Sequence, residues 1–384
     1  MKIKRTRIIT FIIFVAISIS FYFLNQNIPL RTAIFRYFSP GNWYITSEKD
    51  TLYSLGYYGI RKYLTSDKNS EIKLLAQNNS FCHNTFIGRL IGRSGTIYKN
   101  NIYVASRSYL AGDIKVKSEK YLNGEILILR KTDLSIVNKY KSDIKLIDIK
   151  THKNMLIISG LKGFDIYDIS IPDTLKPIFK YRQDKFTEFQ GFTVFNIDTC
   201  SYIAFTRFSE GLSIWDISNP HNIHLAKNIT LQDSLADGTK LPKGLQCFNI
   251  ISKYPYLYAT IAPMSTHFNK ENDRRGIITY DISDINHITQ SVTLIPKKTW
   301  YKKKIGDPEP SYIDLYDNKI YTNFGEKGVA VFDITHPNRA KFERTIDISN
   351  NNFIQPIHIN KKGTLFAGAF YHPEIYSYKI KKEN

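Results

Sequence analysis

The sequence is poor in cysteine. Three cysteines occur in its 384 residues, at Cys82, Cys200 and Cys247. A disulfide-rich scaffold needs more of them, and a zinc site made of cysteines needs four, so both are excluded. The three thiols permit one disulfide at most, with one thiol left over.

Short motifs of the common enzyme classes are also missing. The chain has no Gly-x-Ser-x-Gly, no His-Glu-x-x-His and no Cys-x-x-Cys, and none of its nine histidines are four residues apart. The segment Gly88–Ser94 resembles a phosphate-binding loop, but it is one residue short and has Arg93 where lysine is needed. These absences weaken an enzymatic interpretation without excluding it, because a β-propeller enzyme draws its catalytic residues from different parts of the chain.

Acidic residues are scarce relative to basic ones. There are 53 Lys and Arg against 34 Asp and Glu, which gives a formal net charge of +19. The basic residues are dispersed along the chain, so they indicate at most an anionic surface nearby, such as lipid headgroups or acidic glycans. No nucleic-acid partner is expected, because the N-terminal pattern described below indicates that the protein is exported.

Hydrophobic residues are abundant. They make up 42% of the chain, which is enough to build a packed core and excludes a disordered protein. Tyrosine and phenylalanine, at 26 and 24 residues, far outnumber the three tryptophans. Because these two residue types suit pleated, half-buried surfaces, the composition favours β-strands.

The N-terminus has the pattern of a targeting segment. Lys2, Lys4, Arg5 and Arg7 precede an uncharged apolar run, Ile8–Leu24. A basic flank followed by such a run is typical of a secretory signal peptide or an uncleaved signal anchor. Small residues suited to a signal peptidase occur only inside the run, so we favour a membrane-spanning anchor helix over a cleaved signal. The chain beyond it is then on the exported side, periplasmic or at the cell surface, and is secreted if the signal is cleaved.

The rest of the chain contains seven copies of one short pattern. A glycine begins each clear copy, alternating large residues follow, and Asp-Ile-Ser or Asp-Ile-Thr ends it. The four clear copies are Gly163–Ser170, Gly211–Ser218, Gly276–Ser283 and Gly328–Thr335. Three weaker copies are Gly59–Thr65, Gly124–Leu129 and Glu374–Ile380, the last with glutamate in the glycine place. Such repetition indicates one supersecondary unit per copy.

The aspartates of the clear copies have a structural interpretation. A carboxylate at the end of a strand can accept the backbone N–H two residues further on and so form an Asx turn. We therefore predict that these residues end strands, and we expect a catalytic role for none of them. They are Asp168, Asp216, Asp281 and Asp333.

Two further strand-like segments precede each copy and one follows it. Four short antiparallel strands, repeated seven times without an amphipathic helix, predict an all-β fold, a seven-bladed β-propeller of four-stranded antiparallel blades. We assign residues 1–27 to the signal anchor or signal peptide, 28–41 to a linker and 42–384 to the propeller. The last blade lacks a fourth strand, and Thr32–Phe38 is strand-like. This segment is either a clasp strand that completes the last blade or a loose linker, and we weigh the two equally.

The repeat resembles a known family. The Gly-x-x-Ile-x-Asp-Ile-Ser pattern followed by proline, clearest in Gly163–Ser170 and Gly211–Ser218, is similar to the LVIVD repeat of exported bacterial propeller proteins. The similarity covers the third to sixth copies well and the others poorly. Trp215-Asp216 is also similar to the dipeptide of WD40 repeats, but the other copies lack tryptophan. The LVIVD resemblance implies a propeller outside the cytoplasm and does not imply a reaction.

The innermost strands of a propeller line its central channel. Aligning these strands places five polar side chains at equivalent positions, and they are candidates for binding a ligand in the channel. The candidates are Asp148, Asn196, Asn249, Asp314 and His358. Calcium is the plausible ion for such oxygen donors, although no cofactor is the simpler expectation, since polar residues are also common at a wet channel mouth.

Three functions fit these observations. We expect an extracytoplasmic, membrane-anchored propeller that binds a protein or a carbohydrate, catalyses nothing and is a monomer. Aromatic and charged residues in the long segments between repeats suit such recognition. One alternative is a hydrolase or lyase that uses Asp148, Asp314 and His358 in the channel. The other is a structural or assembly module of the cell envelope.

Overall fold

The computed structural model describes residues 41–66, 71–82, 89–109, 124–183, 188–231, 244–263, 275–296, 310–325, 327–348, 352–370 and 372–381. The predicted anchor helix and the segment Thr32–Phe38 lie outside these residues. Over the described ranges the chain forms strands and turns, and no helix there is long and apolar enough to cross a membrane.

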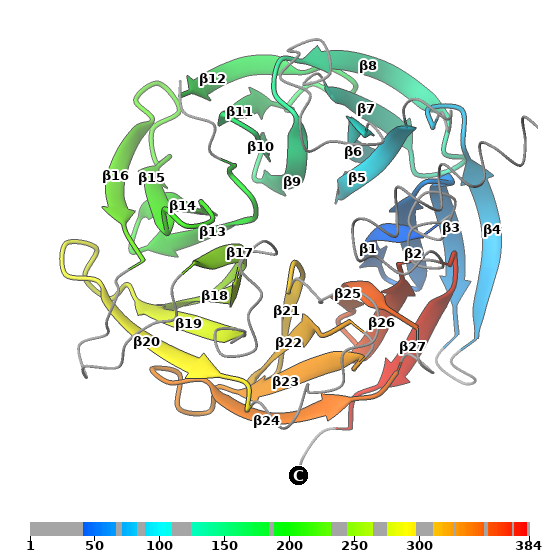
Figure 1. The fold of residues 1–384 in the computed structure, drawn as a ribbon. Helices are drawn as coiled ribbons and strands as arrows, with labels where there is room; N and C mark the ends of the chain where they lie inside the picture. Colours follow the sequence, from blue (N-terminus) through cyan, green and yellow to red (C-terminus); the bar gives the residue numbers. More distant parts are fainter. Residues whose placement is uncertain are drawn as a thin grey trace, which may run out of the picture.

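Seven antiparallel sheets surround a central channel, as Figure 1 shows. The predicted seven-bladed β-propeller is thereby confirmed. Six sheets have four strands, and consecutive strands pair from the channel outward; the seventh has three in the described part of the chain. The blades follow one another around the ring in chain order, so the sequence repeat and the structural repeat coincide.

The first four blades run from Asn42 to Ile229. Blade 1 has β1 (Asn42–Glu48), β2 (Thr51–Gly56), β3 (Gly59–Thr65) and β4 (Ile72–Asn78); blade 2 has β5 (Arg89–Tyr98), β6 (Asn101–Tyr109), β7 (Gly124–Arg130) and β8 (Ile136–Ser142); blade 3 has β9 (Leu146–His152), β10 (Met155–Gly160), β11 (Gly163–Asp168) and β12 (Lys176–Arg182); blade 4 has β13 (Phe192–Ile197), β14 (Cys200–Thr206), β15 (Leu212–Asp216) and β16 (His224–Ile229).

The last three blades run from Leu245 to Lys379. Blade 5 has β17 (Leu245–Lys253), β18 (Tyr256–Pro263), β19 (Gly276–Asp281) and β20 (Thr289–Leu294); blade 6 has β21 (Ile313–Tyr316), β22 (Lys319–Asn323), β23 (Val329–Asp333) and β24 (Lys341–Ile346); blade 7 has β25 (Ile354–Ile359), β26 (Thr364–Ala369) and β27 (Ile375–Lys379).

The repeated motif forms the third strand of each blade and the turn that follows. In the four clear copies, the aspartate Oδ1 accepts the N–H of the residue two positions on, at 2.8 to 3.0 Å; the pairs are Asp168 with Ser170, Asp216 with Ser218, Asp281 with Ser283 and Asp333 with Thr335. Each pair is an Asx turn, the arrangement that the spacing of the motif indicates. These aspartates therefore lie at strand ends, away from the channel.

The motif glycine is required by the outer strand. A Cβ on Gly211 would lie 2.1 Å from the carbonyl oxygen of Ile229 in β16, and a Cβ on Gly328 would lie 2.1 Å from that of Ile346 in β24. Both glycines also have positive φ, at +85° and +79°. Glycine is the only residue that meets both conditions without strain.

The core is divided among the blade interfaces. Each pair of neighbouring blades encloses one apolar cluster, and the cluster between blades 3 and 4 has eleven buried residues. Phe164 lies at its centre, with its ring centroid 4.5 Å from that of Phe205 and 4.9 Å from that of Trp215. The abundant Tyr and Phe residues thus serve to fill wedge-shaped spaces between sheets.

The two ends of the ring differ, and we name them by their connections. The turn face is the end where each first strand ends, and it has the four Asx turns and two-residue turns such as 49–50 and 153–154. The variable face is the opposite end, where each first strand begins. Strand connections that start and finish there differ in length, from 143–145 to 110–123 and 295–312.

Candidate functional site

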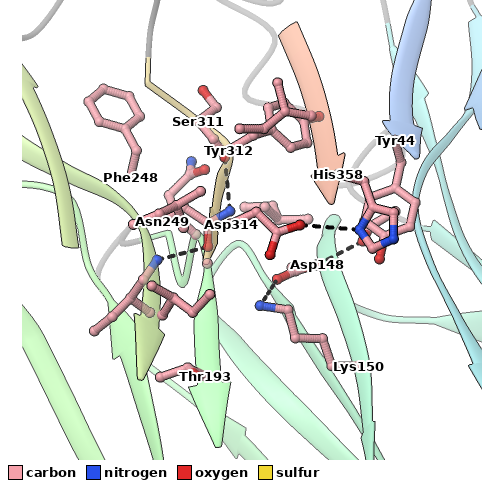
Figure 2. Close-up of a pocket in the computed structure, with 18 of the residues that line it drawn as sticks. Tyr44, Asp148, Lys150, Thr193, Phe248, Asn249, Ser311, Tyr312, Asp314 and His358 are labelled. Atoms are coloured by element: carbon pink, nitrogen blue, oxygen red, sulfur yellow. Dashed lines mark hydrogen bonds and ion pairs between the residues drawn. The ribbon is translucent and has the colours of Figure 1, made fainter. Parts of the chain in front are cut away.

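A cavity of about 230 Å³ occupies the middle of the channel. All seven innermost strands, or the residues just before them, contribute to its lining, and Figure 2 shows the main side chains. Of the five predicted channel residues, the structure brings four to this cavity: Asp148, Asn249, Asp314 and His358.

Asn196 is not among the lining residues. It is exposed near the turn-face end of β13, where its Oδ1 accepts a hydrogen bond of 2.8 Å from the Ser201 hydroxyl. In blade 4 the cavity is lined by Gln190, Gly191 and Thr193 instead. The Phe-Asn-Ile sequence at Asn196 is similar to that at Asn249, but it falls at a different height in the channel, and only the strand register reveals this.

Asp148 is the most buried acidic residue of the cavity, with 8% of its surface exposed. Its Oδ1 accepts hydrogen bonds from the Ser94 hydroxyl of blade 2 at 2.7 Å and from the Ile149 N–H at 2.9 Å. Its Oδ2 is 3.2 Å from Lys150 Nζ, an ion pair, and accepts no hydrogen bond from the described residues. Asp148 therefore joins blades 2 and 3, and its second oxygen is buried beside Lys150.

Asn249 and Asp314 use the same local contact as Asp148. The Oδ1 of Asn249 accepts the N–H of the next residue at 2.8 Å, and so does that of Asp314. Asn249 Nδ2 also donates to the Ser311 carbonyl of the next blade at 2.9 Å, and Asp314 Oδ2 accepts the Ile359 N–H at 2.7 Å. These side chains stabilise exposed edges of the innermost strands and connect neighbouring blades.

His358 lies between Asp314 and a serine that the sequence does not mark. Its Nε2 is hydrogen-bonded to the Ser47 hydroxyl of β1 at 2.8 Å, and its Nδ1 is 3.3 Å from Asp314 Oδ2. Ser47, His358 and Asp314 come from blades 1, 7 and 6, so the three groups form a chain along the wall. Their positions in the sequence are far apart and carry no shared motif, so no sequence pattern indicates Ser47.

Tyr312 and Arg93 line the cavity on the side of the variable face. The Tyr312 hydroxyl donates to the Trp43 carbonyl and accepts a hydrogen bond of 3.2 Å from Arg93. The Arg93 guanidinium also lies over the Trp43 ring, 4.7 Å from its centroid. Burial raises the pKa of Tyr312, so it remains a neutral donor at physiological pH. The same holds for Tyr44, whose pKa is raised by burial and by the charge of Asp148.

The site shows no cluster suited to a metal ion. Over the described ranges, no three His, Cys, Asp or Glu side chains are close enough to share one. The three cysteines are free thiols, and burial raises the pKa of Cys82 to about 11 and that of Cys247 to about 12. Neither thiol is therefore activated as a nucleophile or a metal ligand.

The long segments between repeats that the sequence singles out for recognition are 78–95, 184–192, 262–275 and 300–309, of which 83–88, 184–187, 264–274 and 300–309 lie outside the described residues. Their described parts include Phe189 and Arg275. Each segment connects a strand that ends at the variable face to a strand that begins there. The ends of these segments and the Tyr312 side of the channel therefore share one face of the ring.

No protein-family model matches the chain, and no curated protein does. Among solved structures, the chain is similar to a computationally designed protein, Ika8, with a TM-score of 0.54 and 8% identity over 89% of this chain and 97% of the other. It is also similar to the WD40 β-propeller domain of Doa1, with a TM-score of 0.53 and 9% identity over 89% of this chain and 94% of the other. At these identities the likeness shows the propeller fold alone, and the LVIVD resemblance stays a prediction.

Proposed function

We propose that this protein is a membrane-anchored, exported propeller that binds a protein partner at its variable face and has no catalytic role. The fold is similar to WD40 propeller domains, which commonly bind proteins. Export and anchoring are supported by the basic flank before the apolar run Ile8–Leu24. The LVIVD resemblance, with its extracytoplasmic propellers, agrees with this placement.

The contrast between the two faces carries the proposal. Six of the seven first hairpins close at the turn face through two-residue turns, whereas long and unequal connections such as 110–123, 230–244 and 295–312 belong to the variable face. Loops on a rigid scaffold can change without disturbing the core, and binding residues concentrate there. A ring whose irregularity is confined to one end has the form of a scaffold that presents a recognition surface.

The described part of the variable face presents three half-buried residues, Arg93, Arg207 and Phe208, over the buried rings of Trp43, Phe189 and Phe248. The Arg93 guanidinium stacks on Trp43, and the Arg207 guanidinium lies 5.4 Å from the centroid of Phe189. Phe208 packs edge-on against Phe248, with ring centroids 5.7 Å apart. Arginine and aromatic residues dominate binding energy at interfaces, because they combine a large apolar area with hydrogen-bonding capacity.

Site-specific photocrosslinking tests this proposal. A benzophenone amino acid replaces Phe208 at the variable face or, as the control, Tyr254, which is 53% exposed in a turn at the opposite face. After irradiation of intact cells, we expect a defined protein adduct from position 208 and none from position 254. Equal adducts from both positions, or an adduct from position 254 alone, would contradict it. Binding to a glycan array without a protein adduct would assign a carbohydrate partner.

The chain of Ser47, His358 and Asp314 favours one second candidate, a hydrolase. A serine hydroxyl hydrogen-bonded to a histidine that faces a carboxylate is the arrangement in which histidine removes the serine proton during nucleophilic attack. Here the distances are 2.8 Å and 3.3 Å. Ser47 would be the nucleophile, His358 the general base and Asp314 the residue that orients it.

A fluorophosphonate probe separates this candidate from a structural role of the same residues. Hydrolase activity predicts labelling of the wild type at Ser47 and none of Ser47→Ala or His358→Ala. A wild type that stays unlabelled, with both variants less stable to urea, assigns the three residues to the contacts that join blades 6, 7 and 1.

A further inference from the structure

The third strand of blade 7 is less buried than the third strands of blades 3 to 6. β11, β15, β19 and β23 are buried along their length except at the final aspartate. In β27, by contrast, four residues are half-buried and the fifth is exposed. Every other third strand is covered by a fourth, whereas the outer edge of β27 pairs with no strand in the described part of the chain. An open edge of this kind is a template for another strand.

The seam between blades 7 and 1 is also the least filled of the blade interfaces. Its cluster has four buried residues, Ile45, Leu52, Tyr63 and Phe366, where the interface of blades 3 and 4 has eleven. A cavity of about 80 Å³ remains at the seam, lined by Ile72, Phe366 and Ser377 among others. The seam thus lacks apolar side chains of the kind that an outer strand supplies elsewhere.

The residue just before the first strand packs against the second strand in the same way in blades 1 and 3. A Cβ on Gly56 would lie 2.2 Å from the carbonyl oxygen of Gly41, and a Cβ on Gly160 would lie 2.5 Å from that of Lys145. Gly41 and Lys145 each come just before the first strand of their blade. In blade 3, residues 143–145 are the whole connection from the outer strand of the preceding blade, β8. By the same spacing, residues 39–41 connect an outer strand that ends at Phe38.

The residues at that place match an outer strand of this same propeller. Residues 32–38 read Thr-Ala-Ile-Phe-Arg-Tyr-Phe, and β12 reads Lys-Pro-Ile-Phe-Lys-Tyr-Arg. In β12, Phe179 and Tyr181 turn toward the next blade and lie 5.7 Å and 5.6 Å from Phe164, between ring centroids. Phe35 and Tyr37 have the same spacing and would face the underfilled seam.

From these observations we infer that residues 32–38 are the outer strand of blade 7, antiparallel to β27. Transferring the register of β11 and β12 places Phe35 opposite Ser377 and Tyr37 opposite Ile375. Phe35 then enters the seam cavity beside Ser377. Glu374 has a side chain where other blades have the motif glycine, which in blade 3 faces the Tyr181 carbonyl, so the strand must turn away from β27 at the carbonyl of Tyr37. The occupant of the open edge is therefore a segment of the chain itself.

A cysteine pair in the full-length, membrane-inserted protein tests the pairing. Cys82, Cys200 and Cys247 are first replaced by alanine, and Phe35→Cys is then combined with Ser377→Cys. We expect mild oxidation with copper phenanthroline to give an intramolecular disulfide, seen as a faster band on non-reducing gels that disulfide reduction removes. Arg36→Cys with Ser377→Cys is the matched control, since position 36 faces away from the seam and should remain reduced.

Three outcomes would overturn the inference: no crosslink in either pair, equal crosslinking in both, or a crosslink only between two chains, which would give the edge to a second copy. Hydrogen exchange is an independent measurement should the cysteine variants fold poorly. Phe35→Ser with Tyr37→Ser should speed exchange in the peptide that covers β27 and leave β11 unchanged. Unchanged exchange in β27 would also refute the pairing.

Discussion

At the scale of single residues, the polar side chains of the channel pair with backbone N–H groups on the inner, open edge of the innermost strands. Asp148, Asn249 and Asp314 all satisfy the N–H of the next residue and also contact a neighbouring blade. A buried polar group that is left unpaired costs free energy, so such residues are retained for stability whether or not a ligand binds. The first prediction concerns the most buried of them.

Replacing Asp148 by alanine should lower the free energy of unfolding by about 2 kcal/mol, because the Ser94 hydroxyl, which is only 3% exposed, loses its acceptor. Asp148→Asn keeps an oxygen for Ser94 and for the Ile149 N–H, so its loss should be smaller. Urea unfolding followed by fluorescence measures both. If Asp148→Asn is as damaging as the alanine variant, the ion pair with Lys150 matters more than these hydrogen bonds.

The Asx turns predict a dependence on acid. The N–H and hydroxyl of Ser170 hold the pKa of Asp168 below its usual value, and those of Thr335 do the same for Asp333. A carboxyl whose pKa is lowered by folding contributes stability above its unfolded pKa of about 4, and this is lost as pH falls through the folded pKa.

The double variant Asp168→Asn with Asp333→Asn keeps the turn geometry and cannot titrate. The wild type should be the more stable at pH 7, and the difference in urea midpoint should shrink as the pH is lowered to 3. A difference that stays constant over this range would contradict the assignment of the stabilisation to the ionised carboxylates.

At the scale of elements, the repeat motif forms a third strand that begins with glycine. A side chain at that position would press on a backbone carbonyl of the outer strand. This explains why blade 7 can depart from the pattern. Its motif begins with Glu374, at the end of the sheet where no described strand lies outside it.

We therefore expect Gly211→Ala to destabilise the protein by more than about 1 kcal/mol, since the added Cβ would press on the Ile229 carbonyl at a positive φ. Glu374→Ala is the matched control at the equivalent place in blade 7 and should be close to neutral. Thermal unfolding of the two variants compares them directly. A tolerated alanine at position 211 would show that β16 can move outward freely.

At the scale of the whole molecule, the anchor and the outer strand of blade 7 together would orient the ring on the membrane. An outer strand runs from the turn face to the variable face, so residue 32 would lie at the turn face. The seven residues 25–31 span at most about 25 Å. The turn face would then lie near the bilayer, and the variable face would point away from it, toward a partner.

A fluorophore on single cysteines measures this orientation in reconstituted vesicles. Lys49→Cys lies in a turn at the turn face and Tyr57→Cys at the variable face, both in blade 1. Lipids with nitroxide headgroups should quench the label at position 49 more strongly than the label at position 57. The opposite order would place the variable face against the membrane.

The sequence by itself determined the fold, because the period of the repeat, the Asx turns and the strand-like segments are local features that recur seven times. It also marked Asp148, Asn249, Asp314 and His358 as channel residues. The tertiary structure decided which polar residues meet: it removed Asn196 by strand register, and it brought Ser47 to His358 and Tyr312 to Trp43 and Arg93. These contacts join blades far apart in the chain, and only the closed ring brings such residues together.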